Sequence, residues 1–142
     1  MPEVSVSATI SAPAGKIWAV ITDFARFGEW NTIHTAFPNG GPAELAVGAV
    51  YGEKMTLMGM PAEVSWTVSD VAAPATLTMD GKGPMGITLR QQYTLTGDGE
   101  GTKVTVDSEF KGAAVNMLAA RVKEATSKAL VESLEKLAGL LS

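Results

Sequence analysis

The chain of 142 residues contains no cysteine and a single histidine. Without cysteine it can form no disulfide, no thiolate nucleophile and no cysteine-ligated zinc site, and a domain of this length folds without such cross-links. One histidine, with no second histidine at a ligand spacing, cannot supply the usual zinc ligands. We therefore expect no metal site and no cofactor.

Positive charge is also scarce, because 11 lysines and arginines face 15 acidic residues and the net charge is -4. Proteins that bind nucleic acids neutralise phosphates with a basic surface, so we expect no nucleic-acid partner. No run approaches 18 apolar residues, and Glu3 without any basic residue before Lys16 is the wrong charge for a signal peptide. We expect no stable membrane insertion and a cytoplasmic location.

The composition that remains is typical of a folded domain, with 46% hydrophobic and 18% charged residues. The length fits one domain over residues 1–142, without internal repeats. Residues 4–10 alternate apolar and small polar side chains, which predicts a half-buried strand. Pro13 ends that pattern, and a helix is expected over about 14–23, followed by a short helical turn in which Phe27 and Trp30 share a face.

Strands are predicted for most of the chain that follows. A short edge strand is expected over 32–37, and Gly and Pro turns separate five further segments, which indicates an antiparallel meander. Alternation places the apolar side chains of these strands on one covered face. The five segments are 49–58, 62–71, 75–81, 86–96 and 103–111.

The C-terminal segment, 113–139, lacks proline and is rich in strong helix formers, so one long helix is expected to cover the sheet. Its apolar stripe is uneven, because the bulky leucines lie in the C-terminal half and alanines in the middle. The two halves must therefore pack differently. The alanine-rich part either leaves room between helix and sheet or lets the helix lie closer.

Residues 10–31, with Pro13, Trp18, Asp23 and Trp30 at their spacings, resemble the N-terminal signature of the polyketide cyclase/dehydrase-like branch of the SRPBCC (START-like, helix-grip) superfamily. Later strands, including Tyr93 to Leu95 and 101–104, fit the same pattern. The resemblance implies an α+β helix-grip fold, in which a curved antiparallel sheet of about seven strands (β-α-α-β6-α) wraps around a long C-terminal helix. It also implies a cavity that opens near the two short helices. Some small actinobacterial members of this branch carry a toxin label.

Ligand sites in such folds are apolar hollows with a few polar groups. Methionines suit a surface that accepts several ligand shapes, although they also fill irregular gaps in solid cores, and both alternatives stay open. Buried polar side chains on the covered face need each other, water or a ligand. Arg121 either binds the carboxylate of Glu53 or of a ligand, or lies on a solvated flank. The candidate ligand-binding residues are Trp30, Met55, Leu57, Trp66, Met79, Leu89, Gln91, Tyr93, Ser108, Phe110, Leu118, Arg121 and Val122.

His34 is the one side chain that titrates near neutral pH without help, but no local Ser, Asp or second His forms a motif with it. A surface or structural role is expected for it, and no catalytic residue is assigned. Glu53 shares the parity of Met55, yet both faces of its strand are similarly apolar, so its inward placement stays open. The sequence favours binding of a small, mostly apolar ligand; the alternatives are a cyclase, dehydratase or hydrolase enzyme, and a toxin that acts through its surface.

Overall fold

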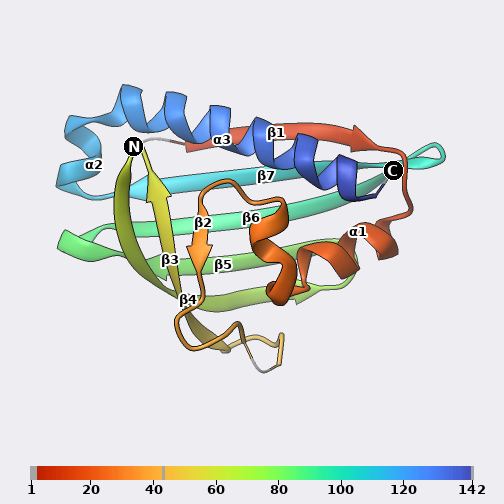
Figure 1. Cartoon of the computed structure of the whole chain (residues 1–142), viewed down its shortest axis with the longest axis horizontal. Helices are drawn as coiled ribbons and strands as arrows, with labels where there is room; N and C mark the ends of the chain where they lie inside the picture. The colour runs from red at the N-terminus through yellow and green to blue at the C-terminus, as the bar shows by residue number, and fades with distance from the viewer. Residues whose placement is uncertain (1–2, 43, 142) are drawn as a thin grey trace.

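The computed structural model describes residues 3–42 and 44–141 and shows a curved sheet that holds a long helix (Figure 1). The elements follow the expected order of one strand, two short helices, six strands and a C-terminal helical segment. They are β1 (Glu3–Ile10), α1 (Ala14–Ile21), η1 (Phe24–Glu29), β2 (His34–Ala36), β3 (Val50–Leu57), β4 (Met60–Ala72), β5 (Thr76–Lys82), η2 (Pro84–Gly86), β6 (Thr88–Asp98), β7 (Gly101–Lys111), α2 (Ala113–Met117) and α3 (Ala119–Leu140).

The seven strands form one antiparallel sheet in the order β1-β7-β6-β5-β4-β3-β2. Strands β2 to β7 are neighbours in chain order, which confirms the predicted meander. Strand β1 pairs with β7 and forms the edge of the sheet opposite β2. The expected helix-grip class is likewise confirmed. The predicted strand limits are off by a few residues, most clearly at β6, because residues 84–86 form the turn η2 instead of extending the strand.

The sheet bends strongly, so that β2 and β3 run across the direction of β5, β6 and β7 and face the helix α3 (Figure 1). The register of β4 on β5 shifts between Val68 and Asp70, a bulge of the kind that increases local twist. Gly81 allows a close approach at the bend, because a Cβ on it would lie 2.8 Å from both Trp66 and Val64 side-chain atoms. A larger residue at this position would push the Trp66 indole out of the inner face.

The expectation of one continuous C-terminal helix over 113–139 is wrong in one respect. Leu118 has φ -117° and ψ 23°, and this non-helical residue separates α2 from α3. Tertiary packing overrides helix propensity here, because Val115 of α2 packs with Phe110 and Val122 in a cluster separate from the main core. No helix in the described part of the chain is long and apolar enough to cross a membrane.

The core is divided along α3. Leu130, Leu134 and Leu137 are buried in the main cluster, which includes Ile17 and Ile21 of α1. Thr32 ties the middle of α3 to the segment after η1, because its amide donates to Ser133 Oγ at 3.0 Å and its hydroxyl to the Ala129 carbonyl at 3.0 Å. The N-terminal half of α3 contributes far fewer buried side chains, and the space beside it forms the site.

Candidate ligand-binding site

An apolar pocket of about 350 Å³ opens between the first turns of α3 and the sheet. Its volume lies in the range of roughly 300–1,000 Å³ that is typical of small-molecule sites. Its walls come from the β3–β4 hairpin, from η2 and the start of β6, and from α2 and α3. We call it the outer pocket; it is lined by Met55, Leu57, Met58, Met60, Pro61, Ala62, Val64, Gly83, Pro84, Met85, Ile87, Leu89, Phe110, Val115, Leu118 and Val122.

The outer pocket lies at the opposite end of the sheet from α1 (Figure 1), so the expectation of an opening near both short helices is wrong. Large side chains fill the space between the short helices and the sheet. Ile17 and Ile21 of α1 and Phe27 of η1 are all buried in the main core. The open end is instead the one where the leucine stripe of α3 has not yet begun.

The pocket rim carries backbone strain at two methionines. Met58 (φ 54°) and Met85 (φ 60°) are the described non-glycine residues with positive φ, and each precedes a glycine that is also left-handed. Since Leu57 pairs with Met60, residues 58 and 59 form a two-residue hairpin turn, for which Asn-Gly is the favoured pair. A methionine there costs conformational energy, and strain of this kind concentrates at functional sites.

A second, smaller cavity lies next to the outer pocket. Both cavities are lined by Met55, Leu89 and Phe110, so these three side chains mark the boundary between them. The inner chamber measures about 30 Å³, which is the space of about one water molecule. Its lining is far more polar than that of the outer pocket and includes Asn31, Glu53, Gln91, Tyr93, Ser108 and Thr126.

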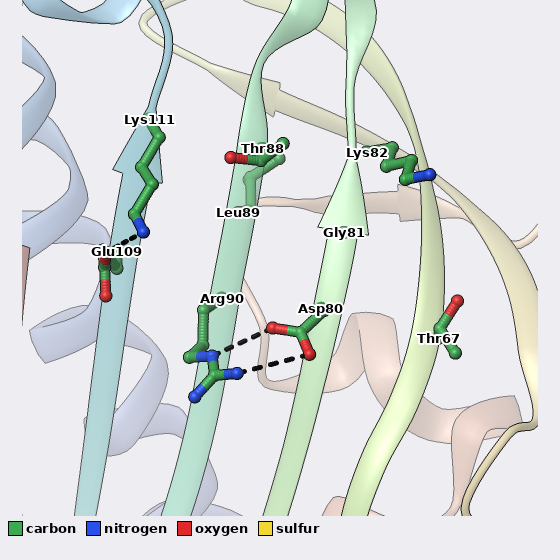
Figure 2. A pocket seen from close by; sticks show the side chains of 9 residues that line it. All are labelled: Thr67, Asp80, Gly81, Lys82, Thr88, Leu89, Arg90, Glu109 and Lys111. Carbon is green, nitrogen blue, oxygen red and sulfur yellow. Dashed lines mark hydrogen bonds and ion pairs between the residues drawn. The ribbon is translucent and has the colours of Figure 1, made fainter.

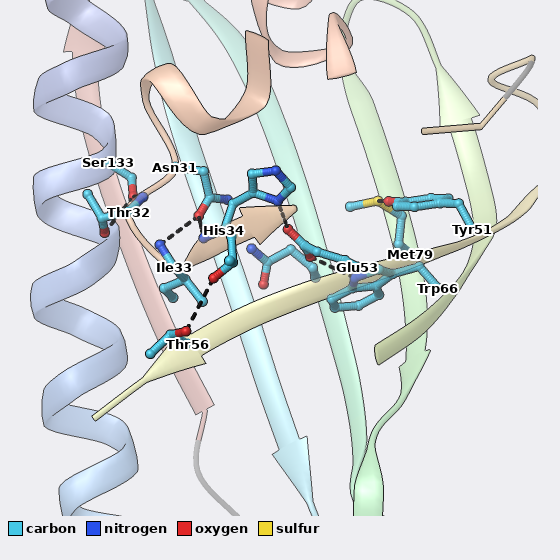
Figure 3. A network of polar contacts seen from close by, with 12 residues as sticks. Asn31, Thr32, Ile33, His34, Tyr51, Glu53, Thr56, Trp66, Met79 and Ser133 are labelled. Atoms are coloured by element: carbon cyan, nitrogen blue, oxygen red, sulfur yellow. Dashed lines mark hydrogen bonds and ion pairs between the residues drawn. The ribbon is translucent and has the colours of Figure 1, made fainter. Parts of the chain in front are cut away.

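Glu53 is the centre of a buried hydrogen-bond network (Figure 3). Its Oε1 accepts from the Trp66 indole N–H at 2.9 Å, and its Oε2 lies 2.6 Å from His34 Nδ1. The side chains of His34 and Glu53 are each only 7% exposed. Asn31 Oδ1 accepts from the amides of Ile33 and His34 and so sets the start of β2. Of the surface or structural placement expected for His34, the geometry fits the structural one, because the ring is held between an acidic partner and neighbouring aromatic rings.

Hydrogen bonds along β6 and β7 line the other side of the chamber. Ser108 donates to Gln91 Oε1, and Gln91 Nε2 lies 3.4 Å from the Tyr93 hydroxyl. Tyr51 donates to the Met79 sulfur at 2.7 Å. Burial raises the pKa of Tyr51 and of Tyr93 well above the ordinary tyrosine value, so both hydroxyls stay protonated at physiological pH. Gln91 and Ser108 are therefore hydrogen-bonded to each other, one of the alternatives expected from their position on the same covered face.

Two buried polar atoms have no hydrogen-bond partner among the described residues: Trp30 Nε1 and Thr126 Oγ1. Thr126 lines the inner chamber from α3, whereas Trp30 lines neither cavity. A buried polar group without a partner costs about 1–3 kcal/mol. The free hydroxyl of Thr126 therefore marks a place where a water or a ligand atom would be stabilised.

The structure brings together all of the predicted ligand-binding residues except Trp30 and Arg121. Trp30 is 1% exposed, so placing it at the cavity rim is wrong. Arg121 is exposed, and Glu53 pairs with His34 instead of with this arginine. The remaining residues divide between the cavities. Leu57, Leu118 and Val122 line the outer pocket; Trp66, Met79, Gln91, Tyr93 and Ser108 line the inner chamber; and Met55, Leu89 and Phe110 line both.

The methionines lie in two different environments. Met55, Met58, Met60 and Met85 line the outer pocket, whereas Met79 packs in the main core. The outer pocket also gains residues from turns, whose side-chain directions alternation cannot predict. Thr126 could have been identified as a site residue from the sequence. It lies four residues after Val122 and four before Leu130, so its hydroxyl falls on the apolar stripe of the helix.

A further groove of about 470 Å³ lies on the outer face of the sheet (Figure 2). Four of its five charged side chains form two pairs: Arg90 Nε lies 2.9 Å from Asp80, and Lys111 lies 3.2 Å from Glu109. Exposed pairs of this kind are ordinary on a solvated sheet face. Among the described residues no group of three or more acidic or histidine side chains could hold a metal ion.

Comparison with known proteins defines the family. The family model described as "Polyketide cyclase / dehydrase and lipid transport" matches residues 1–141, and the chain belongs to this family. It is also 27% identical over 115 residues to Toxin Rv0910 of Mycobacterium tuberculosis, an alignment that covers 81% of this chain and 80% of that protein.

Solved structures show the same fold. Protein CV1439 from Chromobacterium violaceum superposes with a TM-score of 0.78 at 14% identity, covering 97% of this chain and 95% of that one. DynU16, a protein of the dynemicin biosynthetic locus, gives a TM-score of 0.72 at 22% identity, covering 99% of this chain and 47% of that chain. Family and fold together suggest a ligand-binding or cyclase-like role, and the residues of the site must supply the rest.

Proposed function

We propose that this protein binds a small, mostly apolar ligand, with the body of the ligand in the outer pocket. The observation that carries the proposal is an apolar pocket of about 350 Å³ between the sheet and the start of α3. Four methionines line it, and flexible thioethers adapt to aromatic and acyl shapes alike. The strained positions of Met58 and Met85 at its rim support the same conclusion, because neither methionine improves the turn that it occupies.

The expected affinity is modest. Burying an eight-carbon chain stabilises the complex by about 6 kcal/mol at roughly 0.8 kcal/mol per CH₂. Association costs about 4 kcal/mol or more in lost freedom of motion. Without strong polar anchoring, dissociation constants in the micromolar range or weaker follow.

A matched pair of variants on α3 tests the proposal. Val122 is buried in the wall of the outer pocket, whereas Val131 is 42% exposed and lines neither cavity. Val122→Phe should fill the pocket, and Val131→Phe should leave it open. We would screen fatty acids, polyphenols and sterols by thermal shift and tryptophan fluorescence. Binding by wild type and Val131→Phe but not by Val122→Phe supports the proposal. No binding by wild type, or equal binding by Val122→Phe, overturns it.

The buried pair of His34 and Glu53 favours an enzyme of the cyclase or dehydratase kind as a second candidate function. Nδ1 of His34 lies 2.6 Å from the Glu53 carboxylate, and in the tautomer in which Nδ1 donates to it, Nε2 is a proton acceptor. His34 lines neither cavity, which is why binding is the leading proposal. His34→Gln should preserve ligand binding in both cases and abolish turnover of a keto-bearing probe only if the protein is an enzyme.

The relative named as a toxin supports a third possibility, in which the protein acts on a partner through its surface. Growth arrest during expression tests it directly. If wild type and Val122→Phe arrest growth equally, the activity does not depend on the pocket. If neither arrests growth, the toxin hypothesis fails for this chain.

A further inference from the structure

We propose that Glu53, Tyr93 and Thr126 form a polar subsite that selects ligands with one uncharged hydroxyl group at the inner end, as in a phenol or an alcohol. This inference rests on the proposed function, because it assigns the chemistry of the group that passes beyond Met55, Leu89 and Phe110. All three polar residues line the inner chamber. They come from β3, β6 and α3, so the chamber is polar on several sides.

Thr126 provides a buried hydroxyl that lacks a hydrogen-bond partner among the described residues. The residue is 1% exposed. A hydroxyl inside a helix usually bonds to a carbonyl one turn back or points to solvent, and this one does neither. It can donate to or accept from a group placed in the chamber. An apolar ligand end would leave it unsatisfied.

Tyr93 provides a free donor. The Tyr93 oxygen accepts from Gln91 Nε2 at 3.4 Å, and the Asn31 side chain also hydrogen-bonds to this hydroxyl. Among the described residues neither amide takes the tyrosine proton, so that proton is available to a ligand oxygen. The raised pKa of Tyr93 keeps that proton in place. Burial is the main cause, since the residue is 2% exposed.

Glu53 provides the acceptor and sets the charge preference. Among the described residues each carboxylate oxygen has one partner, Trp66 on Oε1 and His34 on Oε2, which leaves lone pairs that can accept from a ligand hydroxyl. Among the described residues, neither lysine nor arginine lines the inner chamber or the outer pocket, and His34 is already engaged by Glu53 Oε2. A carboxylate ligand would therefore meet Glu53 without a free cationic side chain to pair with, and should be disfavoured. A neutral hydroxyl both donates and accepts, so it matches Glu53 together with the two hydroxyl side chains.

The volume of the chamber limits the group to one oxygen. About 30 Å³ holds roughly one water molecule, so a hydroxyl fits and a bulkier polar group does not. The hydrocarbon body then remains in the outer pocket of about 350 Å³. The hydroxyl would replace a water without loss of hydrogen bonds, which is the condition for a favourable exchange.

Three probes of one shape test the subsite: 4-propylphenol, propylbenzene and 4-propylbenzoate, measured by calorimetry. For wild type we expect the phenol to bind about five- to tenfold more tightly than propylbenzene, the fold-change of one net hydrogen bond. The benzoate should bind most weakly. Equal affinity for phenol and propylbenzene overturns the subsite but leaves the proposed function standing. No binding by any of the three overturns both.

Thr126→Val keeps the side-chain shape and removes the hydroxyl. It should reduce the preference for phenol over propylbenzene several-fold without weakening propylbenzene binding. The matched control is Thr78→Val, which changes a buried threonine that lines neither cavity. The same loss of preference in both variants overturns the role of Thr126.

Glu53→Gln removes the charge and tests the second half of the proposal. The affinity for 4-propylbenzoate should rise relative to the affinity for the phenol. An unchanged ratio shows that Glu53 does not set the charge preference. Circular dichroism and urea unfolding of each variant establish that the compared proteins are folded.

Discussion

The two halves of α3 pack differently against the same sheet. In the C-terminal half Leu130, Leu134 and Leu137 are at most 3% exposed and join the main core. In the N-terminal half Val122 and Thr126 face the two cavities instead. The first region is closed by large leucine side chains, and the second is left open by smaller ones, one of which is polar. One helix therefore supplies stability at one end and binding space at the other.

This division makes stability and binding separable by mutation. Truncation at the closed end should unfold the protein without altering the site. Changes at the open end should alter binding with little effect on stability, because the atoms there already border a cavity.

Trp30→Ala should have the largest effect. The indole is fully buried and packs against Phe27 at 4.9 Å and Tyr93 at 6.1 Å between ring centroids. Truncation of a buried aromatic residue costs about 3–5 kcal/mol. The urea midpoint should fall accordingly, while probe affinity of the folded fraction is unchanged. A specific binding defect with little loss of stability would place Trp30 in the site after all.

The same substitution at both ends of the helical segment sharpens the comparison. Leu134 is 2% exposed at the closed end, and Leu118 is 40% exposed in the wall of the outer pocket. Leu134→Ala should cost about 3 kcal/mol, whereas Leu118→Ala should cost less than about 1 kcal/mol. Probe affinity should fall only for Leu118→Ala. Similar unfolding free energies for both variants would refute the division.

Alkaline pH should destabilise the fold through Tyr51 and Tyr93, which line the inner chamber. Burial raises the pKa of Tyr51 and Tyr93 in the folded state, whereas the unfolded chain loses these protons near pH 10. Stability is therefore unaffected by them below about pH 10 and falls above it, by up to about 1.4 kcal/mol per pH unit for each tyrosine. Urea unfolding between pH 9 and about pH 11 measures the slope. Tyr51→Phe should halve the tyrosine contribution, and an unchanged slope would argue against burial as its cause.

Met58→Asn should have the smallest effect, and in the opposite direction. Asparagine tolerates the left-handed conformation that Met58 adopts, so the hairpin should gain about 1 kcal/mol. The outer pocket loses an apolar rim contact, and probe affinity should drop about two- to threefold. Met117→Asn is the control, because Met117 is 85% exposed and lines neither cavity. A loss of both stability and affinity would show that Met58 is placed for packing alone.

Much of the site could be predicted from local pattern. Alternation along β6 and β7 placed Leu89, Gln91, Tyr93, Ser108 and Phe110 on the covered face, and the structure groups them around the cavities. Each of these strands pairs on both sides, so its register leaves one face available to the core.

The network around Glu53 could not be predicted in this way. His34 is 19 positions from Glu53 and lies in a three-residue edge strand with an irregular register, so its direction depends on the turn that Asn31 forms. Arg121 failed as a partner for a related reason. The break at Leu118 changes the course of the helical segment, and no helical spacing shows that break.

The sequence by itself determined the order of the elements, the antiparallel meander and the uneven apolar stripe of the last helix, because periodicity and turn residues act over a few positions. Tertiary structure decided where the cavity opens, which polar groups meet inside it and how little space they leave. Those properties depend on the curvature of the sheet, which arises from the bulge in β4 and the close contact of Gly81 with Trp66. Such contacts join residues far apart in the chain, and only the folded packing brings them within bonding distance.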